Sequence, residues 1–198
     1  MEPLTRNEYN AAYYGDDPAG HHPAGYSPAY GRVVSPSGGE DFASLAGLIH
    51  QTVEVRNKLT LELGCAMGYL VADLRRLGAN VVGIDWSPYA IHHRPDPEAV
   101  GHLHVENVWD YLQPALSPHY DLLVSRFFLE CFRTTDIPAL VRLMNRTATQ
   151  QLHVLSFRPN DQWYLNRTLD WWANQGFAPG TRLMVWARHQ VIEDVEVI

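Results

Sequence analysis

The chain has 198 residues, of which 46% are hydrophobic and 19% charged, so it can bury the core of one globular domain and is neither disordered nor fibrous. Fifteen basic against 22 acidic side chains give a net charge of −7, which argues against a broad electrostatic grip on nucleic acid or anionic lipid. Two cysteines, no long apolar run and no apolar leader favour a cytoplasmic protein without a disulfide framework or a structural zinc site.

The N-terminal segment, residues 1–39, is predicted to be irregular. Ten of the 25 residues from Gly15 to Gly39 are glycine or proline, a density that neither a helix nor a central strand tolerates. Half of the tyrosines nevertheless lie between Tyr9 and Tyr30, and their ring area and hydroxyls suit a segment that folds over something. We therefore expect residues 1–39 to form a flap, which either closes over a site or fills a groove for stability alone.

From residue 40 onward, strand and helix patterns alternate. Short apolar runs predict strands over residues 59–63, 80–84, 102–106, 121–125, 152–157, 181–188 and 191–198. Apolar residues at helical spacing, with caps and glycine stops, predict helices over residues 41–53, 67–77, 87–93, 137–144 and 161–175. This order predicts one three-layer, Rossmann-like α/β domain over residues 40–198, with a largely parallel seven-stranded sheet and an antiparallel C-terminal hairpin.

The clearest chemical signal joins the first predicted strand to the next helix, in the stretch Leu59-Thr-Leu-Glu-Leu-Gly-Cys-Ala-Met-Gly68. Gly64 and Gly68 bracket a turn with two small residues between them, Cys65 and Ala66. A glycine directly after a strand permits a sharp turn and close approach of a ligand to the backbone. The following helix begins with unpaired amide donors at the crevice outside the carboxyl end of the strand.

Two carboxylates define the ligand of this turn. Asp85 ends the second predicted strand, in Val81-Val-Gly-Ile-Asp85, where it can accept hydrogen bonds from both hydroxyls of a ribose. Glu62 stands just before the turn, where its charge would repel a pyrophosphate but suits a cationic amine. The glycine spacing is Gly-x-x-x-Gly instead of the Gly-x-Gly-x-x-Gly of dinucleotide sites. The sequence therefore predicts an adenosine-containing ligand that carries positive charge.

With these residues the chain resembles the class I S-adenosylmethionine-dependent methyltransferases over roughly residues 40–198. The acidic residue and glycine turn of that family match Glu62 to Gly68, and the acidic residue after its second strand matches Asp85. The resemblance implies S-adenosyl-L-methionine as cofactor and methyl transfer by in-line displacement as the reaction. Cys65 and Ala66, within the turn, are implied contacts of the same ligand.

The resemblance also implies further cofactor contacts. The adenine region corresponds to Glu106, Asn107 and Val108, where Asn107 replaces the aspartate of the family and lacks its charge. Ser125, at the carboxyl end of the fourth predicted strand, stands where the family contacts cofactor and acceptor. Two aromatic residues complete the prediction: Trp86 covers the adenine or is a rim tryptophan, and Tyr14 of the flap lines the acceptor pocket or touches the methionine end.

A hydroxyl or protonated amine acceptor also needs a base. The candidates are Glu130, beyond the fourth predicted strand, and the histidine pairs His21-His22 and His92-His93. Each has a plainer interpretation, as an ion-paired carboxylate or as solvated surface histidines. The sequence does not decide among them.

The acceptor is predicted to be a small molecule, and a peptide or protein side chain is the alternative. Where amino-methylating nucleic acid enzymes of this fold carry Asp/Asn-Pro-Pro-Tyr/Phe, this chain has Ser125-Arg-Phe-Phe128, and its net charge is negative. We therefore expect no DNA partner, no membrane partner and no metal, while nothing in the residues requires a homodimer. Two alternatives stay open: a catalytically silent relative that binds or scaffolds, and a nicotinamide-dependent oxidoreductase.

Overall fold

A computed structural model describes residues 6, 8–14, 44–93, 95–113, 119–156, 167–187 and 190–198. Its centre is a seven-stranded sheet, in which every neighbouring pair is parallel except the last. In spatial order the strands are β3 (Leu103–Val105), β2 (Asn80–Asp85), β1 (Leu59–Leu63), β4 (Tyr120–Arg126), β5 (Ala148–Ser156), β6 (Arg182–Ala187) and β7 (Gln190–Glu196). The predicted α/β fold and the antiparallel terminal hairpin are confirmed.

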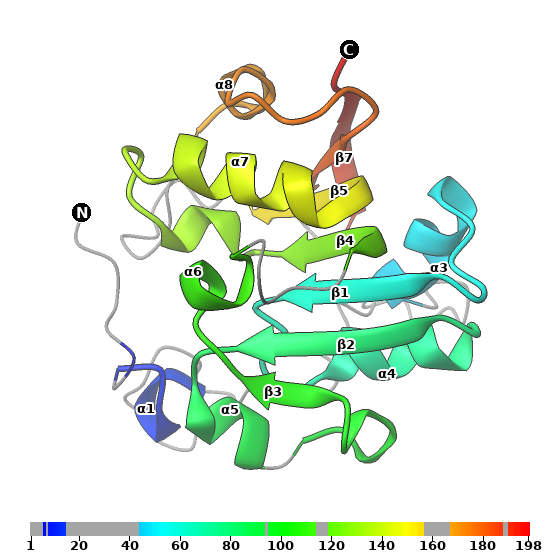
Figure 1. Ribbon diagram of the computed structural model, residues 1–198, viewed down its shortest axis with the longest axis vertical. Helices are drawn as coiled ribbons and strands as arrows, with labels where there is room; N and C mark the ends of the chain where they lie inside the picture. The colour runs from blue at the N-terminus through cyan, green and yellow to red at the C-terminus, as the bar shows by residue number, and fades with distance from the viewer. Residues whose placement is uncertain are drawn as a thin grey trace.

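Helices cover both faces of the sheet (Figure 1). The face formed by Leu122, Val124 and Leu152 packs against α3 (Ser44–Thr52) and α4 (Tyr69–Arg76). The opposite face packs against α6 (Val108–Tyr111), α7 (Ile137–Thr147) and α8 (Leu169–Ala173). Two short elements, α5 (Pro88–His92) and the 3-10 turn η2 (Pro97–Ala99), add Ile91 and Ala99 to the core on the α3 and α4 side. The short helix α1 (Ala11–Tyr14) packs through Tyr14 against the residues that follow β1. The apolar stripes predicted from the sequence thus face the sheet.

Several predicted boundaries need correction. Helix α4 begins at Tyr69, two residues after Met67, because Gly68 has a left-handed conformation with φ of 79°. Strand β5 begins at Ala148, directly after the end of α7, so the polar residues before Leu152 also belong to the strand. The prediction started at Leu152 because only the apolar part of the strand gives a sequence signal. The last helix spans only Leu169–Ala173 in the described region, and the predicted residues 161–166 lie outside it, as do residues 41–43 and 157.

Four short elements gave no periodic signal and were not predicted. They are α1, η2, α6 and the 3-10 turn η3 (Leu129–Cys131), each of about one turn, which is too short for a repeat of apolar residues to show. Two of them, α6 and η3, follow β3 and β4 at the carboxyl end of the sheet. Among the helices that the structure describes, none has the length and apolarity needed to cross a bilayer.

Candidate functional site

The order of the strands locates the site. From β1 the chain continues to β2 and β3 on one side, and from β4 it continues to β5 and β6 on the other. Open parallel sheets bind ligands outside the carboxyl ends of the strands at such a reversal. In Figure 1 the arrowheads of β1 to β4 point to the left, and α1, α5 and α6 lie along that edge. The reversal therefore lies between β1 and β4, next to Gly64.

The turn after β1 takes left-handed conformations at Gly64, Ala66 and Gly68, with φ of 71°, 48° and 79°. The amides of Gly64 and Cys65 both donate to the carbonyl oxygen of Ile84 in β2, at 2.9 and 3.1 Å. Because Ala66 has a Cβ, its left-handed conformation is costly and must be held by its surroundings. The turn is thus fixed to β2 by the protein's own hydrogen bonds.

The two glycines leave room for protein side chains. A Cβ on Gly64 would lie 2.5 Å from Cδ2 of Phe128, and a Cβ on Gly68 would lie 2.7 Å from Cβ of Ala99. The demand for glycine at both positions therefore has a packing explanation in addition to the turn itself. A contact of either residue with a cofactor stays a prediction, and it would involve the backbone.

Asp85 clamps this turn, a role that the sequence did not predict. Its Oδ2 accepts from the amide of Ala66 at 3.0 Å and its Oδ1 accepts from the amide of Ser87 at 2.8 Å. Burial raises the pKa of Asp85 to about 6, although these two amides act in the opposite direction. Each carboxylate oxygen keeps a lone pair for another donor. The half-buried side chain can therefore hold the turn and still accept from a ribose.

Glu62 is the most unusual residue at this edge. Its side chain lies on the α4 face of the sheet and is only 2% exposed, and its Oε2 has no hydrogen-bond partner among the described residues. Burial raises its pKa to about 8; Arg126 and the amide of Val71 lower it, while the charge of Asp85 raises it. A buried carboxylate oxygen without a hydrogen-bond partner is costly, so Oε2 indicates a missing donor or cation.

The residues expected around an adenine lie together after β3. Asn107 caps α6, since its Oδ1 accepts from the amide of Trp109 at 2.9 Å. The carbonyl expected to meet the adenine amino group is thus already used once. Val108 is buried, whereas Glu106 is exposed and its amide donates to the carbonyl oxygen of Asp85. Their contacts with adenine stay predictions.

Part of the predicted flap is docked at the same edge. Ser87 Oγ donates to the carbonyl oxygen of Tyr9 at 2.6 Å and accepts from the amide of Ala90 at 3.1 Å, so one hydroxyl caps α5 and holds the N-terminal segment. The ring of Trp86 meets that of Tyr9 edge to face, with 5.7 Å between centroids. Tyr14 is buried with Ala66 and Met67 of the turn.

Residues 9–14 therefore lie beside Asp85 and the glycine turn, which places Tyr14 near the predicted cofactor. Residues 15–43, which include Tyr26 and Tyr30, are outside the described part of the chain. That residues 1–39 form a flap over the site stays a prediction.

Ser125 belongs to a buried row of hydrogen bonds that the sequence did not reveal. Its Oγ lies 2.8 Å from Nδ1 of His153, whose Nε2 lies 3.1 Å from Oε1 of Gln151. Nε2 of Gln151 donates to Oδ1 of Asn145, which also accepts from the amide of Ala178. Because Oδ1 of Asn145 accepts from a backbone amide, the side-chain amide of Gln151 must turn its Nε2 toward Asn145 and its Oε1 toward His153. Nε2 of His153 therefore carries the proton, and Nδ1 accepts from the hydroxyl of Ser125.

Burial lowers the pKa of His153 to about 3, so the ring is neutral at physiological pH. Ser125 is 2% exposed, and this row ties β4, β5 and α7 together behind the site. A direct contact of Ser125 with cofactor stays a prediction.

The candidate bases are separated. Glu130 lies in η3 and is 1% exposed; its Oε1 accepts from the amide of Ser156 at the end of β5, which fixes the turn after β4. His21 and His22 lie outside the described residues. His92 is exposed in α5, and His93 stacks on Tyr89 with 4.4 Å between centroids. The carboxyl group of Glu130 already fixes the backbone through this hydrogen bond, and its role as a base stays a prediction.

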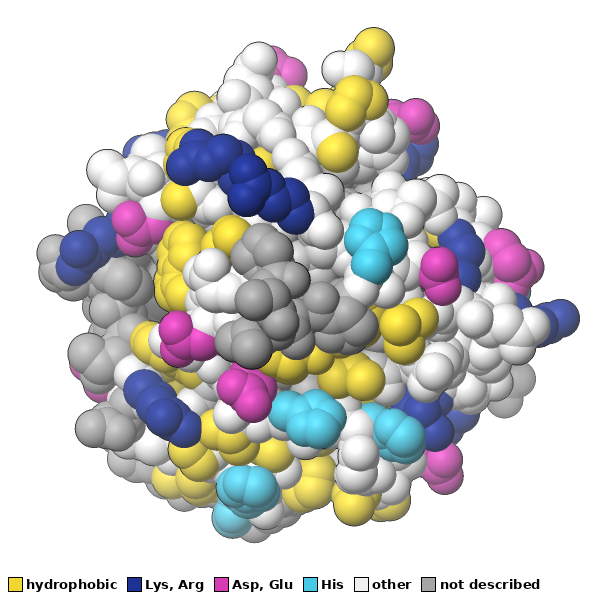
Figure 2. Space-filling model, viewed as in Figure 1, with side chains coloured by type: hydrophobic (Ala, Val, Ile, Leu, Met, Phe, Trp, Pro, Cys, Tyr) yellow, Lys and Arg dark blue, Asp and Glu magenta, His cyan; other side chains and the backbone are white. Residues whose placement is uncertain are grey.

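An aromatic wall, which we define as Phe128, Phe132 and Trp109, borders the turn and was not predicted. Phe128 and Phe132 meet edge to face at 4.9 Å between centroids, and Phe132 meets Trp109 in the same way at 6.0 Å. Each of the three side chains is half-buried. Hydrophobic side chains show on the left of Figure 2, in the area of α6 and η3.

The wall forms because Phe127 has a left-handed backbone, with φ of 52°, which turns the chain sharply after β4. Nothing in the residue type of Phe127 signals that conformation. Among the described residues, no three histidine, cysteine, aspartate or glutamate side chains are grouped to hold a metal ion.

Comparison with known proteins identifies relatives of this architecture. A model of the methyltransferase domain matches residues 40–191. Magnesium protoporphyrin IX methyltransferase from Synechocystis PCC 6803, solved with S-adenosylmethionine bound, has a TM-score of 0.55 and 19% identity over 74% of this chain and 72% of its own. Its complex with S-adenosylhomocysteine gives 0.56 and 17%, over 74% and 76%.

The YcgJ protein from Bacillus subtilis has a TM-score of 0.53 and 16% identity, over 66% of this chain and 64% of its own. At such identities these structures establish a shared fold. No protein of curated function matches the sequence.

Proposed function

Since this chain belongs to the family of methyltransferase domains and is an S-adenosylmethionine-dependent enzyme of class I, we propose that it methylates a nitrogen or oxygen atom of a small molecule. The family decides against the alternative of a nicotinamide-dependent oxidoreductase. A small acceptor is supported by the net charge of −7, which disfavours a polyanionic partner.

One observation carries the assignment of the cofactor site: the buried carboxyl group of Glu62, which lacks a partner for Oε2 among the described residues. S-Adenosylmethionine carries a cationic amine on its amino-acid end, which is the kind of donor this carboxyl group lacks. Asp85 adds an acceptor for the ribose hydroxyls at the end of the neighbouring strand. The residues therefore fit the cofactor at its two polar ends.

S-Adenosylmethionine, held by Glu62 and Asp85, would supply an electrophilic methyl group to a lone pair of the acceptor, with the sulfur as leaving group. The residues of this chain contribute position. Asp85 fixes the glycine turn beside the cofactor through the amide of Ala66. Alignment of reacting groups supplies on the order of 7–11 kcal/mol to such reactions. The acceptor proton passes to a base, for which Glu130 remains a candidate.

Replacing Asp85 by alanine tests the ribose assignment. The variant is expected to bind S-adenosylhomocysteine about 1–3 kcal/mol more weakly in calorimetry, because hydrogen bonds to a charged acceptor are lost. Asp121→Ala is the matched control, since Asp121 also accepts a backbone amide, that of Leu59, but at the start of β4 and far from the turn.

The control should retain wild-type affinity. Asp85→Asn separates the hold on the turn from the proposed binding of the ribose, because an amide oxygen can still accept from one backbone donor. A folded Asp85→Ala protein with unchanged affinity would remove Asp85 from the cofactor site.

A further inference from the structure

The aromatic wall has no function assigned so far. It starts at the glycine turn, because the ring of Phe128 fills the space that a Cβ on Gly64 would need. From there it continues outward through Phe132 to Trp109, in centroid steps of 4.9 and 6.0 Å. The wall is therefore continuous with the part of the site where the methionine end of the cofactor is proposed to lie.

The backbone that supports the wall is strained. Phe127, a residue with a bulky aromatic side chain, has φ of 52°, and its amide donates to the carbonyl oxygen of Val154 at 2.8 Å. Non-glycine residues in this conformation persist where the surroundings demand it, and such strain concentrates at functional sites. Glu130 holds the next turn in place through the amide of Ser156. Two separate anchors thus fix where Phe128 and Phe132 stand.

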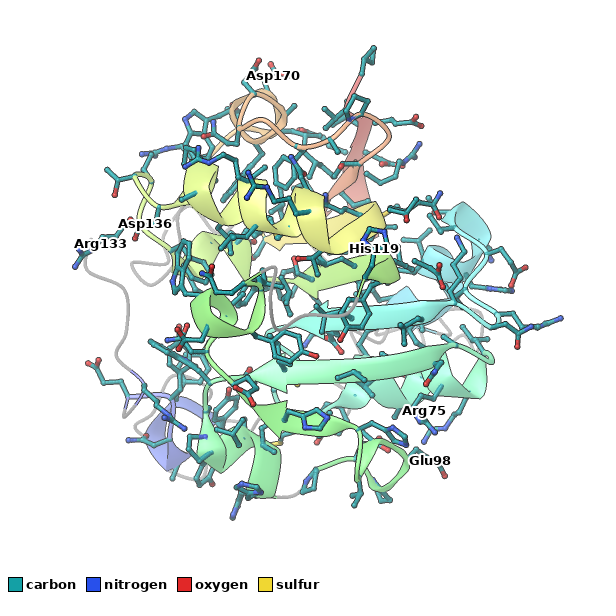
Figure 3. All side chains as sticks on the ribbon, viewed as in Figure 1. Arg75, Glu98, His119, Arg133, Asp136 and Asp170 are labelled. Carbon is teal, nitrogen blue, oxygen red and sulfur yellow. The ribbon has the colours of Figure 1, made fainter. Side chains whose placement is uncertain are left out.

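The exposure of the wall points to a ligand. The three side chains pack against the core on the α6 and α7 side of the sheet, yet each stays half-buried, although apolar rings of this size gain most from complete burial. The three residues lie at the carboxyl edge of the sheet, where α6 and η3 follow β3 and β4. Figure 3 shows Arg133 and Asp136 farther out along the same edge, where the exposed Arg133 reaches solvent.

We propose that the aromatic wall is the acceptor-binding surface and that the acceptor is a planar, uncharged aromatic or heteroaromatic ring system carrying the nucleophilic hydroxyl or amine. This inference rests on the proposed methyltransferase function and names its substrate class. Aromatic rings prefer edge-to-face or offset contact with other rings, which a saturated ring of equal size cannot make as well. A cationic acceptor is disfavoured because it would approach a sulfonium.

The span of the wall sets the size of the acceptor. Neighbouring rings of the wall have centroids 4.9 and 6.0 Å apart, so an acceptor that touches all three side chains must be larger than a single ring. Acceptors of a single small ring would contact Phe128 and Phe132 but leave Trp109 unused. Trp109 is therefore the residue of the wall that distinguishes extended from compact acceptors.

The test uses two probes of equal carbon skeleton, 2-naphthol and decahydro-2-naphthol, titrated into the full-length protein saturated with S-adenosylhomocysteine. Both carry one hydroxyl, but only naphthol is planar. Wild-type protein is expected to bind naphthol about 2- to 13-fold more tightly than its saturated counterpart. Trp109→Leu and Phe132→Leu retain apolar bulk without an aromatic face, and each should remove most of that preference while leaving the affinity for S-adenosylhomocysteine intact.

Trp171→Leu is the matched control. Trp171 is half-buried and also meets a neighbouring ring edge to face, that of Trp172, but it lies in α8, away from the wall. This variant should keep the preference for naphthol. Equal binding of the two probes to wild-type protein, or failure of both to bind, overturns the proposal. Absence of S-adenosylhomocysteine binding would instead overturn the cofactor site, so the two failures are distinguishable.

Discussion

Replacing Glu62 by glutamine is expected to stabilise the free protein at pH 8 and to weaken its binding of S-adenosylhomocysteine. The carboxyl group has an ordinary pKa of 4.5 when unfolded, and burial raises its pKa to about 8 in the folded protein. Between these values the folded state holds a proton that the unfolded state releases. The free energy of unfolding therefore falls as the pH rises from about 4.5 to 8.

The difference between the unfolded and folded pKa values of Glu62 sets the size of the change in stability. At about 1.4 kcal/mol per pH unit, the two pKa values correspond to a ceiling of about 5 kcal/mol. Glutamine cannot ionise, so Glu62→Gln should lose this pH dependence and exceed the wild type in stability by up to that amount at pH 8. At pH 4.5 the two proteins should differ by about 1 kcal/mol or less. Urea unfolding at a series of pH values measures both quantities.

The proton that Glu62 holds in the free protein should be released when the ligand binds. A cationic amine beside Glu62 favours its carboxylate, so binding of S-adenosylhomocysteine near pH 7 should release a proton, and affinity should rise by up to about tenfold per pH unit between pH 6 and 8. Calorimetry in two buffers with different ionisation enthalpies measures the released proton. Glu193→Gln, a change of an exposed carboxylate in β7, is the matched control and should behave as wild type. Binding without proton release would place the amine elsewhere.

Replacing Gly68 by alanine is expected to cost about 2–5 kcal/mol of the free energy of unfolding. Two contributions add: about 1–2 kcal/mol for a Cβ in a left-handed backbone and about 1–3 kcal/mol for overpacking. The added methyl group would lie 2.7 Å from Cβ of Ala99 and 2.8 Å from the methyl groups of Leu103. A Cβ is part of the backbone frame, so the clash must be relieved by movement of α4, η2 or β3.

Gly101→Ala separates these contributions. Gly101 has φ of 84°, close to the 79° of Gly68, but a Cβ there would meet nothing within 4 Å. This variant should therefore lose only about 1–2 kcal/mol. Urea unfolding of both variants gives the packing contribution by difference. Equal losses in the two variants would show that Gly68 is needed only for its backbone conformation.

The elements predicted best are those whose signals are local. Strand β1 has the predicted bounds, 59–63, because its apolar residues end at a glycine turn, and Ser87 caps α5 in front of Pro88 as expected. The Glu62-to-Gly68 motif and Asp85 were likewise readable, since strand ends and spacing determine which sheet edge they share.

The contacts that could not be predicted join residues that are distant in sequence. Phe128 reaches Gly64 only through the left-handed Phe127, and phenylalanine is not a residue type that signals this conformation. Asp85 was expected to serve a ribose, but its clamp on Ala66 depends on how the turn folds back toward β2. Asn107 was expected to meet adenine, yet the one-turn helix that it caps has no sequence period.

The hydrogen-bonded row from Ser125 to Asn145 limits how this sequence can diverge. Loss of His153 alone would leave the hydroxyl of Ser125 and Oε1 of Gln151 without partners in a buried place, at about 1–3 kcal/mol for each stranded group. Joint replacement of Ser125, Gln151 and His153 by apolar residues escapes that penalty, while Asn145 keeps its bond to the amide of Ala178. Descendants of this gene should therefore keep the row intact or exchange it as a block, so residue pairs across β4 and β5 are expected to covary.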